Sequence, residues 1–301
     1  MKENEREYLR KLKSKTLLFG GVFVGGFILL PIAIFAGAIT ERGIFGGLLI
    51  ISVISLFVCG ILFGKNQKKY RSYFKQIFVT RLIKDIMPDA EYYPERGFSS
   101  ELISKTGLMM MGNRYGSEDY VKGVYNGVAF ERADMYIADE STDSEGHTTT
   151  TTYLQGRWMI FETNKDFSAD LQVIQKGFGY AKKKKGLFTR KAERRHVFQT
   201  EDEAFNKQFT CLCQDETEAF YLLTPGMMQS LMKLTSEAPG KVMVGFVENR
   251  IHVAVHTGKD SLEPSIFKQL DYEKERRAVA AEMNAITSFI SALNLDRRIF
   301  Q

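Results

Sequence analysis

Two cysteines and two histidines form the arrangement in this sequence that comes closest to a chemical site. Cys211 and Cys213 are separated by one residue in an apolar, alternating stretch, and His252 and His256 lie in a later stretch of the same kind. In an extended strand, side chains two or four residues apart lie on one face, so each pair would share a face. Two thiolates and two imidazoles are a ligand set that tetrahedral zinc accepts.

The spacing of these residues argues against zinc. Zinc-binding cysteines are usually separated by two or more residues, and histidines four residues apart suit a helix rather than a strand. Cysteine is also among the residues most often buried in protein cores. The sequence therefore predicts that Cys211 and Cys213, in line with Phe209, are core residues, and it predicts no metal and no cofactor.

Sequence signatures of catalysis are absent. The chain has no Walker loop, no His-Glu-x-x-His motif and no nucleophile elbow. Gly123, Tyr125, Gly127 and Gly156 could line a ligand groove, but glycines in strands more often serve turns and close packing. We predict a binding or scaffolding module with no catalytic residues; the alternative is a membrane-tethered enzyme that acts on a small molecule or a lipid.

Two uncharged stretches near the N-terminus determine where these residues are expected to lie. Neither Thr16 to Ile39 nor Ile44 to Gly64 contains Asp, Glu, Lys or Arg. Each is long enough to cross a hydrocarbon core of ~30 Å as a helix, which predicts a two-helix transmembrane hairpin at 16–64. The alternative is a signal peptide ending near Ala36-Gly37-Ala38, but the apolar run is longer than such peptides have, and a second run follows at once.

Basic residues flank the hairpin on both sides. They are Lys2, Arg6, Arg10, Lys11, Lys13 and Lys15 before it and Lys65, Lys68, Lys69, Arg71 and Lys75 after it. Because Lys and Arg accumulate on the cytoplasmic side, we predict a multi-pass protein of the bacterial cell membrane with both termini in the cytoplasm. Residues 1–15 then form a basic cytoplasmic N-terminus, and 65–87 form a basic juxtamembrane helix that Pro88 ends.

Glycines at four-residue spacing occur in and beside both uncharged stretches. The pairs are Gly21 with Gly25, Gly43 with Gly47 and Gly60 with Gly64. Small residues at this spacing let helix backbones approach closely in lipid. They would pack the two helices of the hairpin against each other, or pack the hairpin against a second copy or another membrane protein.

A strongly basic stretch interrupts the C-terminal part of the chain. Its basic residues are Lys182, Lys183, Lys184, Lys185, Arg190, Lys191, Arg194 and Arg195. Next to a membrane such a cluster would contact anionic lipid headgroups, and the alternative is a solvated loop. Because the positive charge is confined to this stretch and to the flanks of the hairpin, no nucleic-acid partner is predicted.

Residues 88–301 are predicted to form one cytoplasmic α+β domain. Asn126-Gly127 lies between two alternating stretches and predicts a two-residue hairpin turn, and Asn249-Arg250 predicts a second hairpin. Thr224-Pro225 marks the start of a helix, whereas the polar stretch Ser141 to Thr152 is predicted to be a loop. With a long amphipathic helix from Asp271, the expected fold is a set of antiparallel strands with flanking helices.

Several short motifs resemble an uncharacterised bacterial membrane protein family. They are Val121-Lys-Gly-Val-Tyr-Asn-Gly-Val-Ala-Phe130, Gly156-Arg-Trp158, Phe205-Asn-Lys-Gln-Phe209, Tyr221-Leu-Leu-Thr-Pro225 and Val247-Glu-Asn-Arg-Ile251. The family is a domain of unknown function with two N-terminal transmembrane helices. The resemblance implies an integral bacterial membrane protein, and it supplies no functional residues.

Overall fold

The structure, a computed structural model, describes residues 3–40, 44–178, 195–268 and 270–295. The chain divides into two compact units, each with its own architecture. Unit 1 comprises Met1–Arg81 and Glu263–Arg276, and unit 2 comprises Leu82–Leu262 and Arg277–Gln301.

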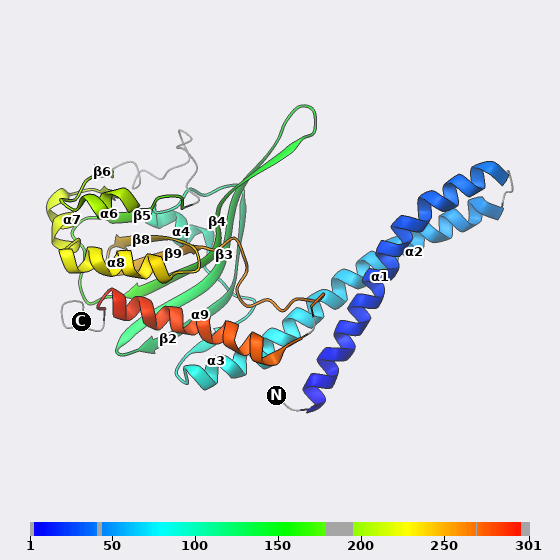
Figure 1. Cartoon of the computed structure of the whole chain (residues 1–301), viewed down its shortest axis with the longest axis horizontal. Helices are drawn as coiled ribbons and strands as arrows, with labels where there is room; N and C mark the ends of the chain where they lie inside the picture. Colours follow the sequence, from blue (N-terminus) through cyan, green and yellow to red (C-terminus); the bar gives the residue numbers. More distant parts are fainter. Residues whose placement is uncertain (1–2, 41–43, 179–194, 269, 296–301) are drawn as a thin grey trace. The chain divides into compact units, whose positions relative to one another are not determined.

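Unit 1 is a pair of long helices, α1 (Glu3–Thr40) and α2 (Ile44–Phe74) (Figure 1). A five-residue π-helix, η1 (Lys75–Val79), continues α2 and leads into α3 (Thr80–Ile86), so the predicted helix after the uncharged stretches is confirmed. Many large apolar side chains of α1 and α2 are exposed, among them Phe27 at 58% and Phe57 at 71%.

The prediction that these helices cross a membrane finds no support in this unit. In the part of the chain that the structure describes, no helix has both the length and the apolar composition needed to cross a bilayer.

Glycines bring α1 and α2 together, but they are largely not the predicted ones. A Cβ at Gly26 would lie 2.3 Å from Leu56, and one at Gly20 or Gly60 would lie 2.9 Å from Phe63 or Phe23. Only Gly60 belongs to the predicted pairs. Gly21, Gly25 and Gly64 have open space where a Cβ would stand, and the contacts of Gly43 and Gly47 lie outside what the structure describes.

Unit 2 is built on a large antiparallel sheet, which confirms the α+β class. Among the described residues nine strands are joined in the order β1-β2-β3-β4-β9-β8-β5-β7-β6. Their bounds are β1 Glu91–Tyr93, β2 Arg114–Tyr125, β3 Val128–Thr142, β4 Thr148–Glu162, β5 Leu171–Gln175, β6 His196–Phe198, β7 Phe209–Cys213, β8 Lys241–Val247 and β9 Arg250–His256.

Turn chemistry fixes the two hairpins. Asn126 (φ 49°) and Gly127 (φ 81°) join β2 to β3, with Tyr125 paired to Val128, as predicted for a turn that needs two left-handed residues. The turn between β8 and β9 lies one residue earlier than predicted, at Glu248 (φ 59°) and Asn249.

The polar stretch predicted as a loop is instead a two-stranded ribbon. β3 runs on to Thr142 and β4 begins at Thr148, and these two residues pair with each other. The ribbon projects beyond the rest of the sheet (Figure 1). Threonine is β-branched and favours extended backbone, a preference that outweighed the lack of apolar side chains to bury.

Helices cover both faces of the sheet. α4 (Ser100–Thr106) covers one face, while α8 (Pro225–Glu237) and α9 (Tyr272–Ala292) from Arg277 onward cover the other (Figure 1). α8 begins as predicted, because the Thr224 hydroxyl accepts a hydrogen bond from the Met227 amide at 3.2 Å. Two short helices, α6 (Glu203–Gln208) and α7 (Glu216–Leu222), flank β7.

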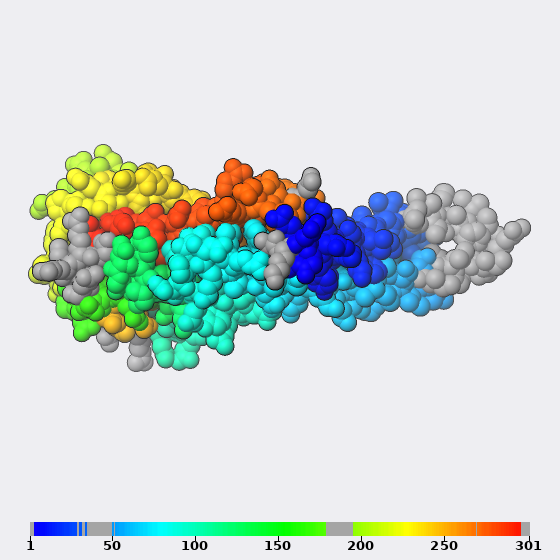
Figure 2. Space-filling view, turned by 90° about the horizontal axis from the view of Figure 1, so that it is seen from below, coloured from blue at the N-terminus to red at the C-terminus, as the bar shows by residue number. Residues whose placement is uncertain are grey.

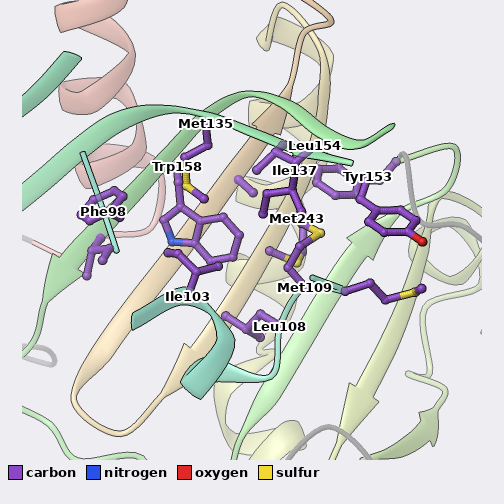
Figure 3. Packing of buried hydrophobic residues seen from close by; sticks show 14 of the residues in the cluster. Phe98, Ile103, Leu108, Met109, Met135, Ile137, Tyr153, Leu154, Trp158 and Met243 are labelled. Atoms are coloured by element: carbon purple, nitrogen blue, oxygen red, sulfur yellow. The ribbon is translucent and has the colours of Figure 1, made fainter. Parts of the chain in front are cut away.

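The core on the α4 side is centred on Trp158 of β4. Its indole packs with Phe98, Ile103 and Met135 (Figure 3). The Trp158 Nε1–H donates to Nδ1 of His252 at 3.1 Å, so the polar edge of the ring is satisfied inside the core. Since successive residues of a strand point to opposite faces, the neighbouring Arg157 lies on the other side of the sheet, under α9.

The groove between α8 and α9

Four charged side chains meet beneath α9 on the face opposite Trp158. Asp134 of β3 and Arg157 of β4 are directly paired in the sheet, and Arg132 lies two residues before Asp134 on the same face. Glu282 reaches them from α9, one residue before the buried Met283. All four therefore lie between the sheet and the helix.

Glu282 links the two arginines. Its Oε2 lies 2.5 Å from Arg157 Nη1 and 3.2 Å from Arg132 Nη2. Arg132 Nη2 is also 2.5 Å from Oδ1 of Asp134. The Asp134 carboxylate accepts hydrogen bonds from the backbone amide (2.9 Å) and the hydroxyl (3.1 Å) of Ser261. One helix carboxylate thus binds two strands at once.

The two arginines differ in how well their charge is compensated. Burial acts to lower the pKa of Arg132, but Asp134, Glu282 and Asp119 outweigh it and raise that pKa. At Arg157 burial prevails and lowers the pKa, although Glu282 acts against it. Both guanidinium groups stay charged at neutral pH. Among the described residues, neither Nε of Arg157 nor Nε of Arg132 has a hydrogen-bond partner.

A groove runs between α8 and α9 and has Arg157 in its lining. It encloses about 890 Å³, which is in the range of small-molecule sites. Figure 2 shows the two helices, yellow and red, side by side on one surface. The groove is lined by Arg157, by Ser230, Lys233, Leu234, Glu237, Ala238 and Pro239 of α8 and its end, and by Ala281, Glu282, Asn284, Ala285, Ser288, Phe289, Ser291 and Ala292 of α9.

Small side chains at helical spacing keep the groove open. Ala281, Ala285, Ser288 and Ala292 recur every three or four residues, so they lie on one face of α9. Alanine and serine are too short to fill the gap to α8. Buried Leu234 and Phe289 make part of the wall apolar. The groove can therefore hold an apolar molecule with a polar contact at Arg157.

The predicted cysteine and histidine pairs lie on opposite faces of the sheet. Residues that pair across neighbouring strands lie on the same face of the sheet. Cys213 pairs with Leu171, Leu171 with Phe246 and Phe246 with Ile251, so Cys213 and Ile251 share a face. His252, the next residue after Ile251, therefore points to the opposite face. The four side chains cannot bind one ion. No cluster of three or more metal-binding side chains occurs among the residues that the structure describes.

Neither core cysteine is prepared for nucleophilic chemistry. Both are buried, as predicted, and burial raises the pKa of Cys211 to about 12 and that of Cys213 to about 11. Cys213 Sγ lies 3.8 Å from Nε2 of His196, and the same nitrogen lies 3.3 Å from Glu216. In a catalytic triad, one imidazole nitrogen faces the nucleophile and the other is hydrogen-bonded to the acid. Here Cys213 and Glu216 both face Nε2 of His196, so the arrangement is not a triad.

Most of the predicted lipid-contact stretch lies outside the described residues. Lys182, Lys183, Lys184, Lys185, Arg190, Lys191 and Arg194 belong to that part, and their contact with lipid stays a prediction. Arg195 is buried, with its side chain 1% exposed, 2.9 Å from Asp170. Its guanidinium donates to the carbonyls of Thr106 (2.8 Å) and Gly107 (3.0 Å) at the end of α4. Arg195 therefore cannot reach a lipid surface.

Two of the glycines for which close packing was favoured over a ligand groove are closely packed. A Cβ at Gly156 would stand 2.1 Å from the backbone oxygen of Val255, and one at Gly123 would lie 3.0 Å from Phe130. Arg132, Arg157 and Glu282 were not predicted as site residues. The sequence offers two indications of them. Arg132 and Arg157 lie within strand stretches rich in apolar residues, and Glu282 lies beside the apolar stripe of α9.

Comparisons with known proteins agree with the prediction of an uncharacterised family. Residues 152–295 match the model of a family described as a protein of unknown function (DUF3137), and this range includes both walls of the groove. No curated protein matches the chain. Among solved structures, the chain is similar to the crystal structure of the mycobacterial trehalose monomycolate transport factor A, with 10% identity, a TM-score of 0.39, and coverage of 74% of this chain and 96% of that chain.

Proposed function

We propose that this protein is a non-catalytic binding protein whose ligand site is the groove between α8 and α9. The observation that carries the proposal is an open groove of about 890 Å³ whose walls are partly apolar and whose lining includes one buried arginine. Sites for small molecules are concave, mainly apolar and supplied with a few polar groups that orient the ligand.

The environment of the reactive side chains favours binding over catalysis. The two buried thiols have raised pKa values, and the imidazole of His252 accepts a hydrogen bond inside the core. Arg132 and Asp134, buried charges beside Arg157, form an ion pair with each other, and Arg132 also contacts Glu282 of α9. These groups stabilise the fold, and none is arranged to transfer a proton to a ligand.

We also propose that the protein associates with the bacterial cell membrane through α1 and α2, with both termini on the cytoplasmic side. Two features support this: the absence of charged residues from 16–39 and 44–64, and the basic flanks of these stretches. The exposed apolar side chains of the two helices add to it, because a contiguous apolar surface requires a partner or a lipid environment.

A cysteine placed in the groove tests whether it binds apolar molecules. In a Cys59→Ser background, Ser288→Cys provides an exposed thiol in the groove, and octanamide is an uncharged probe with an apolar chain. We expect octanamide to slow maleimide labelling of Cys at 288 in the full chain. Ala285→Trp, which fills the groove, should abolish this protection.

Two controls make the result specific to the groove. Ser236→Cys places a thiol on an exposed part of α8 outside the groove, and its labelling should not respond to octanamide. Ala204→Trp adds the same bulk to an exposed position of α6 and should leave protection intact. Equal effects at 288 and 236, or no effect at 288, would refute the binding function.

A further inference from the structure

We propose that the groove between α8 and α9 selects a small amphiphile with a single carboxylate, which Arg157 binds while the apolar chain lies along α9. This inference rests on the proposed function and specifies its ligand. It concerns the charge of the ligand, whereas the proposed function requires only that an apolar molecule enters the groove.

The charge of the ligand follows from the state of Arg157. The residue is 5% exposed, it forms an ion pair with Glu282, and its Nε–H has no acceptor among the described residues. The Nε–H of Arg132 also lacks one, but Arg157 lines the groove and Arg132 does not. A buried guanidinium with donors to spare favours an additional acceptor, and its planar fork matches a carboxylate. A ligand without an acceptor would leave this donor unsatisfied.

Glu282 forms ion pairs with both Arg132 and Arg157. Of the two arginines, Arg157 is the one that can bind a ligand carboxylate. Arg132 also has Asp134 at 2.5 Å and the carbonyl oxygen of Asp119 at 3.2 Å, so it retains acceptors when Glu282 moves. In the part of the chain that the structure describes, Glu282 is the one carboxylate that forms an ion pair with Arg157. A ligand carboxylate can therefore share Arg157 with Glu282 or replace Glu282 there.

A single negative charge suits this cluster better than two. Asp119, Asp134 and Glu282 carry three formal negative charges around the two arginines, so a dianion such as a phosphate monoester meets stronger repulsion than a monoanion does. The ligand also needs an apolar chain, because Ala281, Ala285 and Phe289 of α9 line the groove.

Octanoate and octanamide separate this inference from the proposed function. The two probes have the same chain and differ in charge, and protection of Cys at 288 from maleimide reports occupancy of the groove in the full chain. Because hydrogen bonds to charged groups contribute more than neutral ones, we expect octanoate to protect with about tenfold higher affinity than octanamide. Equal affinities would overturn the inference and leave the groove as a binding site, whereas protection by neither probe would refute both.

Two substitutions assign the preference to Arg157. Arg157→Met should reduce the ratio of octanoate to octanamide affinity from about ten to about one, and Arg157→Lys should retain part of that ratio, since the positive charge remains. Glu282→Gln removes the competing carboxylate and should strengthen octanoate binding several-fold. If octanoate keeps its advantage in Arg157→Met, or if Glu282→Gln weakens it, the carboxylate is not bound where we propose.

Discussion

Arg195 shows how much one buried cation contributes to unit 2. Its guanidinium joins Asp170 to the last carbonyls of α4. Arg195→Met would leave the Asp170 carboxylate buried without this cation, and removing one partner of a buried pair costs about 3–5 kcal/mol. We expect thermal unfolding of the full chain to show a clear drop in midpoint temperature for this variant.

A surface pair provides the control for this measurement. Arg114 contacts Glu140 at 2.7 Å, but its side chain is 58% exposed, so Arg114→Met should cost no more than about 1 kcal/mol. Asp170→Asn combined with Arg195→Met should recover part of the loss, because the double variant no longer buries the carboxylate charge. Equal costs for the two arginines would show that Arg195 does not act as a buried counter-ion.

Single residues were predictable where a pattern surrounds them. The alternation of Phe209, Cys211 and Cys213 placed both thiols in the core, where they lie. Arg195 ends a run of basic residues, and composition alone cannot separate one buried guanidinium from its solvated neighbours. Arg157 follows a glycine and precedes Trp158, and its acidic neighbours Asp134 and Glu282 are revealed only by the pairing of β4 with β3 and by the packing of α9.

At the scale of elements, Gly156 determines how closely β4 and β9 approach. Its φ is +157°, and a Cβ there would stand 2.1 Å from the Val255 backbone oxygen. Gly156→Ala must therefore separate the two strands, and a backbone clash of this kind costs more than about 2 kcal/mol. We expect urea unfolding of the full chain to shift to markedly lower concentration.

Another strand glycine gives the comparison. At Gly116 of β2 the nearest atom to an added Cβ is Cβ of Tyr136 at 3.9 Å, an ordinary contact. Gly116→Ala should leave the unfolding midpoint near that of the parent chain, because it adds a side chain without a clash. If both substitutions are tolerated equally, close approach is not the reason for glycine at 156.

Local signals predicted the elements, but they could not predict the groove. Asn126-Gly127 and Thr224-Pro225 each specify one turn or one helix start, and both elements form where predicted. The groove depends on the distance between α8 and α9, which are separated in the chain by β8 and β9. A small residue such as Ala285 indicates a groove only when the helix that faces it is known.

For the whole molecule, the orientation of α1 and α2 is the testable expectation. A reporter active only outside the cytoplasm should be inactive when fused after Gln301, because both termini are predicted to be cytoplasmic. The same reporter inserted at 40–43 should be active if the helices cross the membrane. An active C-terminal fusion with a silent insertion would reverse the orientation, and two silent fusions would mean that the helices do not cross.

The strand order has a consequence for how the chain is made. β4 pairs with β3 on one side and with β9 on the other, where Glu162 pairs with Arg250. At a synthesis rate of about 5–20 residues per second, the roughly 90 residues between these partners take about 5–20 s to emerge. During that time the edge of residues 156–162, which β9 covers in the folded sheet, stays open, and open edges pair with other chains. Aggregation through this edge is therefore expected during translation, before β9 leaves the ribosome.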